Sequence, residues 1–280
     1  GIDYLKFNAG FGMSGNDNIN FDAYRSYFKS GMFLNRAPGL SLANIGNTEL
    51  QWETTKRFNA GFEMNTLNNR LGVKFNYFHS WTDNLLTLQE LGYLSGLDYN
   101  WSNGGSLKNQ GFEVTVNAHL VNHKDWNWTA GLTVGHYVNE LTSLPDNKSF
   151  MDTEVYGATV RSQIGSSINQ FYGYRTNGVY STSEEAKAAN LYIEDETGAR
   201  TYFGAGDVRF ADLNGDGKIN EKDRTVIGDA TPDIYGNFYT SLSWKNLTLD
   251  ANFTYSLGND AFNYMRQQLE SGSRFMNQTT

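Results

Sequence analysis

The clearest chemistry in this sequence lies in a twelve-residue segment rich in oxygen-bearing side chains, from Asp212 to Asp223. Asp or Asn stands at its positions 1, 3, 5 and 12, and the glycine at position 6 permits a sharp turn. Ca²⁺ takes roughly six to eight oxygen ligands at such spacing, one of them the main-chain carbonyl of position 7. The segment therefore predicts a calcium-type loop. Its predicted ligands are Asp212, Asn214, Asp216, Lys218 through its carbonyl, and Asp223.

The last of these ligands departs from the standard EF-hand, in which a glutamate binds the ion through both oxygens. The shorter arm of Asp223 predicts weaker or differently arranged coordination, as in dockerin-like variants of this loop. A structural Ca²⁺ that staples an extracellular loop fits the weak affinities of extracellular modules. The alternative is a turn rich in Gly, Asn and Asp that binds no metal.

Other groupings of reactive side chains give no sign of catalysis. His119 and His123 are four residues apart, but the pattern places them at a strand end and its turn rather than on one helix face. Neighbouring acids such as Glu184 and Glu185 are typical of solvated loop surface, although paired carboxylates also serve glycosidases. The sequence contains no Gly-x-Ser-x-Gly nucleophile motif. We therefore expect a protein that is not an enzyme.

Composition narrows the fold and the partners. A formal net charge of −8 over 280 residues disfavours a general affinity for nucleic acid. The absence of cysteine excludes disulfides and thiolate metal sites. There is no apolar run of about 18 residues, the length of a transmembrane helix. A mean hydropathy of −0.54 is compatible with a membrane barrel, because only alternate residues of each strand face lipid.

Alternation of apolar and polar residues with a period of two is the main structural signal. From Leu247 to Leu257 it continues for 11 residues, which matches the roughly 9–11 residues of a tilted strand that crosses a bilayer. The same pattern recurs along the chain, so the sequence predicts an all-β, antiparallel fold. The seven predicted strands contain residues 5–11, 58–64, 71–77, 112–120, 128–134, 238–244 and 247–257.

Aromatic residues gather near the ends of these strands. Tyr77, Phe78 and Trp81 stand in one strand, and Trp126 and Trp128 stand in another. Amphipathic rings prefer the interface between membrane and water, and barrels carry girdles of them there. The pattern therefore favours a transmembrane β-barrel over a soluble sandwich.

Connection lengths strengthen this interpretation, because short and long connections alternate strictly. All long connections then lie on one side of the sheet, as in outer-membrane barrels with short periplasmic turns and long extracellular loops. A soluble sandwich has no reason to sort its loops in this way. The short turns are 65–70, 121–125 and 245–246; the long connections are roughly 14–55, 82–109, 139–234 and 258 to the end.

The longest of these loops, 139–234, contains two further features. Residues 181–190 predict a short helix, because capping residues precede an alanine-rich stretch. Four tyrosines in the loop either stack on sugars or pack the loop on itself, and packing is the favoured interpretation. These are Tyr172, Tyr174, Tyr180 and Tyr202.

A series of short motifs resembles the TonB-linked outer-membrane proteins of the SusC/RagA family. Singly each motif is weak, but together they cover most of the chain in the family's order. The matching residues are Leu5-Lys6-Phe7, Gly10-Phe11-Gly12, Gly15-Asn16, Asn47 to Thr55, Asn69-Arg70, Thr82 to Leu86, Asn103-Gly104-Gly105, Asn109 to Glu113, Gly206-Asp207, Asp212 to Gly217, Asp223, Ile227-Gly228, Pro232 and Tyr235-Gly236.

The resemblance implies a 22-stranded barrel with an N-terminal plug, driven by the inner-membrane TonB complex. It also implies a surface lipoprotein of the SusD type that lids the barrel and presents glycans or peptides. A signal peptide, the plug, a TonB-contacting segment and the family's last strands are not recognised in residues 1–280. Since seven strands cannot close such a barrel, we expect these residues to be a partial barrel from the C-terminal portion of a longer protein.

This resemblance predicts active import of nutrients across the outer membrane of a Gram-negative, Bacteroidetes-type cell. Loops 82–109 and 139–234 would form part of the seat for the lid. Two rivals remain open: a secreted, calcium-binding β-protein that binds carbohydrate or mediates adhesion, and a passive porin. Residues expected to face the barrel interior are Glu113, Thr115, Asn117, Asp250 and Asn252.

Overall fold

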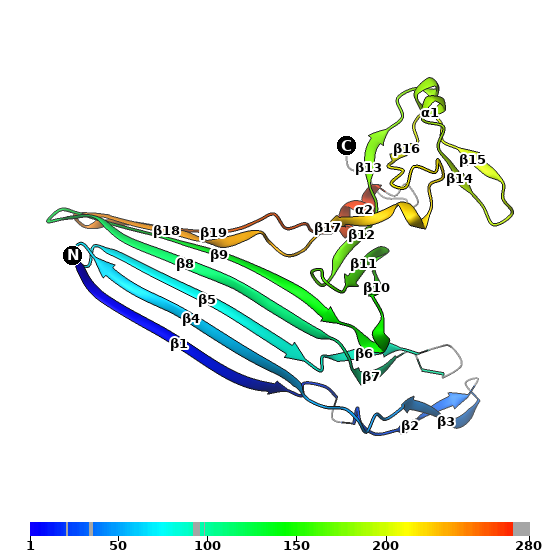
Figure 1. The fold of residues 1–280 in the computed structure, drawn as a ribbon, viewed down its shortest axis with the longest axis horizontal. Helices are drawn as coiled ribbons and strands as arrows, with labels where there is room; N and C mark the ends of the chain where they lie inside the picture. Colours follow the sequence, from blue (N-terminus) through cyan, green and yellow to red (C-terminus); the bar gives the residue numbers. More distant parts are fainter. Residues whose placement is uncertain (21, 34–35, 92–95, 98, 271–280) are drawn as a thin grey trace. The chain divides into compact units, whose positions relative to one another are not determined.

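The computed structural model of the chain divides into two compact units. Both are drawn in Figure 1. Unit 1 holds residues 1–151, 163–168 and 232–258, and unit 2 holds residues 152–162, 169–231 and 259–280. The structure describes residues 1–20, 22–33, 36–91, 96–97 and 99–270.

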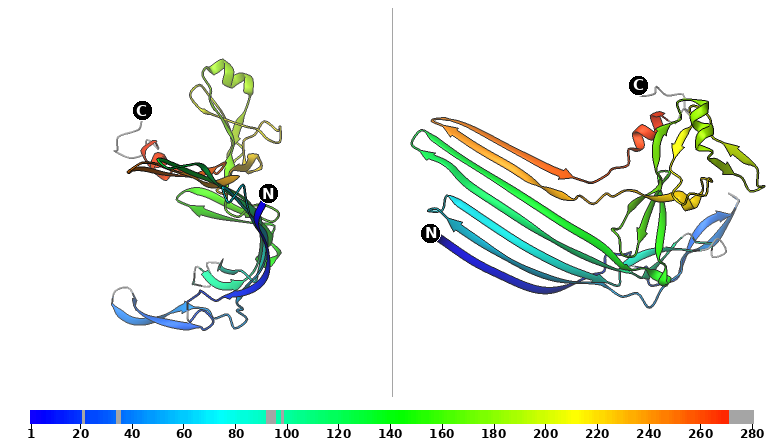
Figure 2. Two further views of the ribbon diagram at one scale, coloured as in Figure 1. Left: turned by 90° about the vertical axis from the view of Figure 1, so that its left-hand side faces the viewer. Right: turned by 45° about the horizontal axis from the view of Figure 1, so that its top comes forward.

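Unit 1 is built on a large antiparallel sheet, which confirms the all-β prediction. Within the described residues it has seven strands, in the order β1-β4-β5-β8-β9-β18-β19. These correspond to the seven strands predicted from alternation. The sheet is curved when it is seen from its end (Figure 2, left). The strands are β1 (Ile2–Asn16), β4 (Glu53–Thr66), β5 (Leu71–Asp83), β8 (Ser106–His123), β9 (Trp126–Ser143), β18 (Ile234–Trp244) and β19 (Leu247–Leu257).

One face of this sheet is an apolar band. The register aligns Phe7, Phe62, Phe75 and Val114 on four successive strands. The rings of Phe62 and Phe75 stack at 5.7 Å between centroids, and Phe7 follows at 6.5 Å from Phe62. Phe7 nevertheless remains 74% exposed. An exposed apolar surface of this extent suits contact with lipid.

The ends of the apolar band carry aromatic and charged residues. At the turn end, Trp126 packs on Trp244 with 5.8 Å between ring centroids. At the loop end, the His79 ring stacks on Trp81 at 3.9 Å. The predicted girdle is wrong for Phe78, because its neighbour Tyr77 pairs with Phe112 on the apolar face and the alternation turns Phe78 to the opposite face.

The described connections are sorted by length, as predicted. The short turns after β4, β8 and β18 lie at one end of the sheet, where the Lys245 N–H donates to the Asp125 carbonyl at 2.9 Å. The other connections contain hairpins or a whole domain. They are shorter than predicted because the strand ladders extend further, with β9 running to Ser143 and β18 beginning at Ile234. The hairpins are β2 (Tyr27–Phe33) with β3 (Ala37–Asn44), and β6 (Leu86–Glu90) with β7 (Tyr99–Asn103).

Unit 2 has a small core of its own. Tyr180, Ala186 and Ile219 are nearly inaccessible to solvent, and Asp223 is fully buried. The predicted helix forms as α1, and its N-cap Thr182 accepts a hydrogen bond from the Glu185 N–H at 3.2 Å.

Unit 2 also contains short strands, and the described part of the segment after β19 includes a helix, α2 (Tyr264–Glu270). The sheets are β10-β11-β12-β17, β13-β16 and β14-β15. The bounds are β10 (Phe150–Val155), β11 (Ala158–Gln163), β12 (Gln170–Tyr174), β13 (Thr176–Val179), β14 (Tyr192–Glu194), β15 (Arg200–Tyr202), β16 (Val208–Phe210), β17 (Arg224–Gly228), α1 (Ser183–Ala189) and the 3₁₀ turn η3 (Glu221–Asp223). A further 3₁₀ turn, η2 (Pro145–Asn147), belongs to unit 1.

Candidate functional site

The face of the main sheet opposite the apolar band is polar. Alternation along β8 places Glu113, Thr115 and Asn117 on this face, as predicted. On β19, Asn252 lies in the same row as Asn117, and Asp250 lies two residues further along. All five residues predicted to face the interior therefore share one face of the sheet.

Two tyrosines of β18 each lie across a different glycine of β9 and reach a polar side chain of β8. The Tyr235 hydroxyl donates to the Glu113 carboxylate at 2.9 Å. Its ring covers Gly135, where an added Cβ would lie only 2.4 Å from a ring atom. Tyr239 covers Gly131 in the same way and donates to Asn117 Oδ1 at 3.1 Å.

We call these contacts tyrosine–glycine clamps. A third clamp is made by Tyr255 of β19, which crosses Gly236 and donates to the Thr133 carbonyl at 2.8 Å. Sequence reasoning missed all three. Each clamp needs a glycine on one strand, a tyrosine beside it on one neighbouring strand and a hydrogen-bond acceptor on the other side. This arrangement can be recognised only after the strand register is known.

A shallow hollow of about 420 Å³ lies on the polar face. It is lined by charges of both signs, Arg57 and Glu113, and by two aromatic side chains, Phe78 and Tyr137. Side-chain amides can donate and accept hydrogen bonds at once, so this surface suits an extended polar chain. The remaining lining residues are Asn59, Asn76, Asn109 and Ser80.

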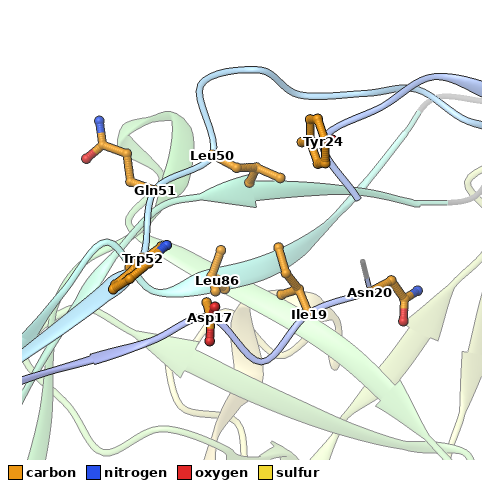
Figure 3. A pocket seen from close by; sticks show the side chains of 8 residues that line it. All are labelled: Asp17, Ile19, Asn20, Tyr24, Leu50, Gln51, Trp52 and Leu86. Atoms are coloured by element: carbon orange, nitrogen blue, oxygen red, sulfur yellow. The ribbon is translucent and has the colours of Figure 1, made fainter. Parts of the chain in front are cut away.

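A second hollow, of about 380 Å³, lies at the loop end of unit 1 (Figure 3). In this view Tyr24 and Leu50 face Ile19 and Leu86 across it, and Trp52 closes one end. The other lining residues are Asp17, Asn20 and Gln51.

Side-chain amides and a carboxylate fix the walls of this second hollow. Asn103 of β7 accepts from the Gln51 N–H at 2.6 Å and donates to the Gln51 carbonyl at 2.8 Å. Asn47 donates to the Trp101 carbonyl at 3.2 Å. Glu53 accepts from the Leu86 N–H at 2.9 Å. These contacts join the first two long connections to one another and hold the hollow open as a built feature.

The calcium-type loop folds around its own carboxylates. Asp212 accepts from the Gly215 N–H at 2.7 Å and from the Gly217 N–H at 2.8 Å. Asp216 accepts from the Lys218 N–H at 2.8 Å, and this main-chain bond is the main cause of a lowered pKa of the Asp216 carboxyl. The Lys218 N–H thus favours the ionised form of the Asp216 carboxylate, as a cation would.

Asp223 closes the base of this loop. Its two oxygens accept from the N–H groups of Leu213 and Asn220, at 3.0 and 2.9 Å. Ile219 anchors the loop inward, as predicted. Among the described residues, no three Asp, Glu or His side chains gather as a metal centre. The oxygens fit Ca²⁺ by type, because each retains a lone pair beyond the N–H that it accepts. Calcium binding stays a prediction.

The tyrosines of the long loop mostly pack on their neighbours. Tyr180 is buried against Phe203, and burial raises the pKa of the Tyr174 hydroxyl beside Phe210. The guanidinium of Arg161 covers the Tyr172 ring at 3.4 Å. Tyr202 pairs with Tyr192 but stays exposed. Tyr202 is therefore the most exposed of the four tyrosines.

Comparison with known proteins identifies the family. A family model described as "TonB dependent receptor-like, beta-barrel" matches residues 3–255. The chain belongs to the TonB-dependent receptor β-barrel family. Members of this family are outer-membrane transporters rather than enzymes, which confirms the predicted location and the absence of an enzymatic role. No helix among the described residues is long and apolar enough to span a bilayer.

Individual relatives support the SusC/RagA resemblance within the TonB-dependent receptors. TonB-dependent receptor P3 of Formosa agariphila is 30% identical over 97% of this chain and 27% of its own length. TonB-dependent receptor SusC of Bacteroides thetaiotaomicron is 26% identical over 91% of this chain and 25% of its own length. The RagAB peptide transporter structure superposes with a TM-score of 0.74 at 25% identity, covering 92% of this chain and 27% of that one. The chain thus spans about a quarter of the length of these TonB-dependent receptors.

Proposed function

We propose that the whole protein actively imports nutrient oligomers, glycans or peptides, across the outer membrane, and that this chain forms part of its barrel wall. The observation that carries the proposal is the division of one sheet into an apolar band and a polar face, in a chain of the TonB-dependent receptor family. The apolar band contacts lipid. The polar face, with the clamps of Tyr235 and Tyr239 and its mixed-charge hollow, contacts the plug or the passing solute.

The same proposal includes two partners. A surface lipoprotein of the SusD type lids the barrel on the long-loop side, and the TonB complex supplies energy through a plug. The relatives support both, because SusC is a TonB-dependent receptor and the RagAB structure is a peptide transporter named for two components. In this proposal connection 84–105 and loop 144–233 form part of the lid's seat.

Membrane fractionation of the full-length parent, followed by detergent pull-down of its partners, tests the proposal. Recovery in the outer membrane together with a surface lipoprotein supports the importer. A soluble product without a partner would instead favour a secreted, calcium-binding β-protein. Uptake of labelled oligopeptides and oligosaccharides by wild-type and deletion strains then separates the two substrate classes, and the RagAB likeness makes peptides the first class to screen.

We also propose that Ca²⁺ binds the Asp212–Asp223 loop and stabilises unit 2. Supporting this are the ligand spacing and the main-chain N–H groups that already fix the orientation of the Asp212 and Asp216 carboxylates. Calorimetric titration of the full-length parent with Ca²⁺ to about 2 mM, near the weak end of the range for extracellular modules, tests it. Binding that Asp212→Asn abolishes and Glu184→Gln leaves intact supports the site. Absence of heat in the wild type contradicts it.

A further inference from the structure

The hollow at the loop end of unit 1 has polar groups that the protein itself does not use. The Asp17 carboxylate, the Asn20 side-chain amide and the Trp52 indole N–H form no hydrogen bond or ion pair within the described part of the chain. Trp52 is also 66% exposed. Exposed polar groups around an apolar concavity are the usual composition of a ligand site.

The charge of the hollow limits the class of ligand that it can bind. Among the described residues that line the hollow, Asp17 is the only charged one and the others are neutral. A ligand that carries a positive charge gains from this carboxylate, whereas an anionic ligand is repelled by it. The aromatic side chains also favour a positively charged ligand, because the faces of Trp and Tyr attract cations. The ring of Tyr24 already holds the guanidinium of Arg25 at 4.9 Å.

Shape narrows the ligand further. Ile19, Leu50 and Leu86 give the hollow aliphatic walls, which suit the methylene stem of a long side chain. The volume of about 380 Å³ is near the lower end of ligand pockets, so it takes one side chain or one ring rather than an oligomer. A sugar ring needs hydrogen-bonding partners around its whole edge, and three aliphatic walls leave much of that edge unpaired.

We propose that this hollow binds the lysine or arginine side chain of a peptide substrate on the extracellular side. The stem packs between the aliphatic residues and Trp52, while the cationic head meets Asp17. The inference rests on the proposed import function and deepens it, because it assigns a basic peptide residue to a defined site. Rigid walls matter here, since the Asn103 and Glu53 contacts organise the site before the ligand arrives.

Terminally blocked tripeptides on the full-length parent in detergent test the proposal. The probes are Ala-Lys-Ala and its uncharged counterpart Ala-norleucine-Ala, with affinities measured by isothermal titration at low salt. We expect the lysine peptide to bind about five- to tenfold more tightly, the size of an exposed charge pair with cation–π support. Asp17→Asn should remove this difference, and Trp52→Ala should weaken both peptides.

The control variant is Glu184→Gln, which removes an exposed acid from α1 and should leave both affinities unchanged. Salt at about 0.5 M should shrink the lysine preference, because exposed charges are then screened. Equal binding of the two peptides by the wild-type protein would overturn the proposal without any variant. So would maltotriose binding that depends on Trp52.

Failure of the inference is separable from failure of the import function. If the parent lies in the outer membrane and takes up oligomers, but the lysine preference is absent or survives in Asp17→Asn, only the basic-residue site is wrong. If the parent is soluble and takes up no oligomer, the import function itself is wrong.

Discussion

The main sheet and unit 2 are built from the same kinds of residue, but they are stabilised differently. Large apolar side chains of the sheet stay open, as Phe7 at 74% and Leu249 at 64% exposure show. Unit 2 instead excludes solvent from Tyr180 and Asp223, which are 1% and 0% exposed. The sheet therefore depends on strand ladders and a lipid surround, whereas unit 2 depends on a small core that water does not enter.

The largest expected effect comes from emptying the core of unit 2. Tyr180→Ala should destabilise unit 2 by about 3–5 kcal/mol, because a buried aromatic ring is replaced by a cavity. Hydrogen exchange of the full-length parent measures this as lost amide protection in residues 176–231. The exposed Tyr202→Ala serves as the control. Equal loss in both variants would contradict a core centred on Tyr180.

A charge on the apolar band should have the next largest effect. Phe62→Arg should cost about 2–4 kcal/mol in a bilayer, since the guanidinium enters the hydrocarbon. Unfolding of the full-length parent in lipid vesicles by urea measures the loss. Asn8→Arg, one row away on the polar face, should cost much less. A reversed order would mean that the faces are assigned the wrong way round.

Removing one clamp hydroxyl should have a smaller effect. Tyr235→Phe should lower the free energy of unfolding by about 1–3 kcal/mol, because the part-buried Glu113 carboxylate on the polar face loses this hydrogen-bond donor. Tyr239→Phe, whose partner is the neutral Asn117, should cost about 0.5–1.5 kcal/mol. Thermal unfolding of the two variants in lipid tests this order. Unchanged stability in both would show that the rings alone account for the clamps.

The smallest effect concerns the exposed turn between β14 and β15. The pKa of Asp195 is lowered from its ordinary 3.8, chiefly by the Thr197 hydroxyl, which donates to it at 2.7 Å. A lowered folded-state pKa adds stability above the ordinary value, and this is lost as pH falls through the lowered value. The protection factor of the Ala199 amide, which is the exchange rate corrected for intrinsic exchange, should therefore fall as pH drops through the lowered pKa of Asp195. Asp195→Asn should remove the pH dependence.

The sequence was sufficient to predict the sheet, its faces and the sorting of its loops. Period two is a local property, so each strand could be recognised without its neighbours. The prediction for Phe78 was wrong because its aromatic type alone was taken as a sign of the girdle. Alternation from Tyr77 turns the Phe78 ring to the polar face. The strand ends failed by several residues because the ladders continue into polar segments such as Lys108 opposite Glu140.

The sites were harder to predict, for a physical reason. The Asn103 clasp on Gln51 joins residues 52 apart, and each tyrosine–glycine clamp joins residues 122 apart. Such pairs depend on register and loop path, neither of which leaves a periodic trace in the sequence. The calcium-type loop is the exception, because all of its ligands lie within one short segment. Its occupancy stays a prediction.

The tyrosine–glycine clamps also bear on how the barrel is assembled. Each clamp joins two strands that are separated by a third strand. It can therefore form only after the strand between them has paired with both. A slip of one residue would turn Tyr235 to the lipid side and separate it from Glu113. Strands paired out of register would lack these bonds, so the clamps favour the native register of the sheet over its neighbours.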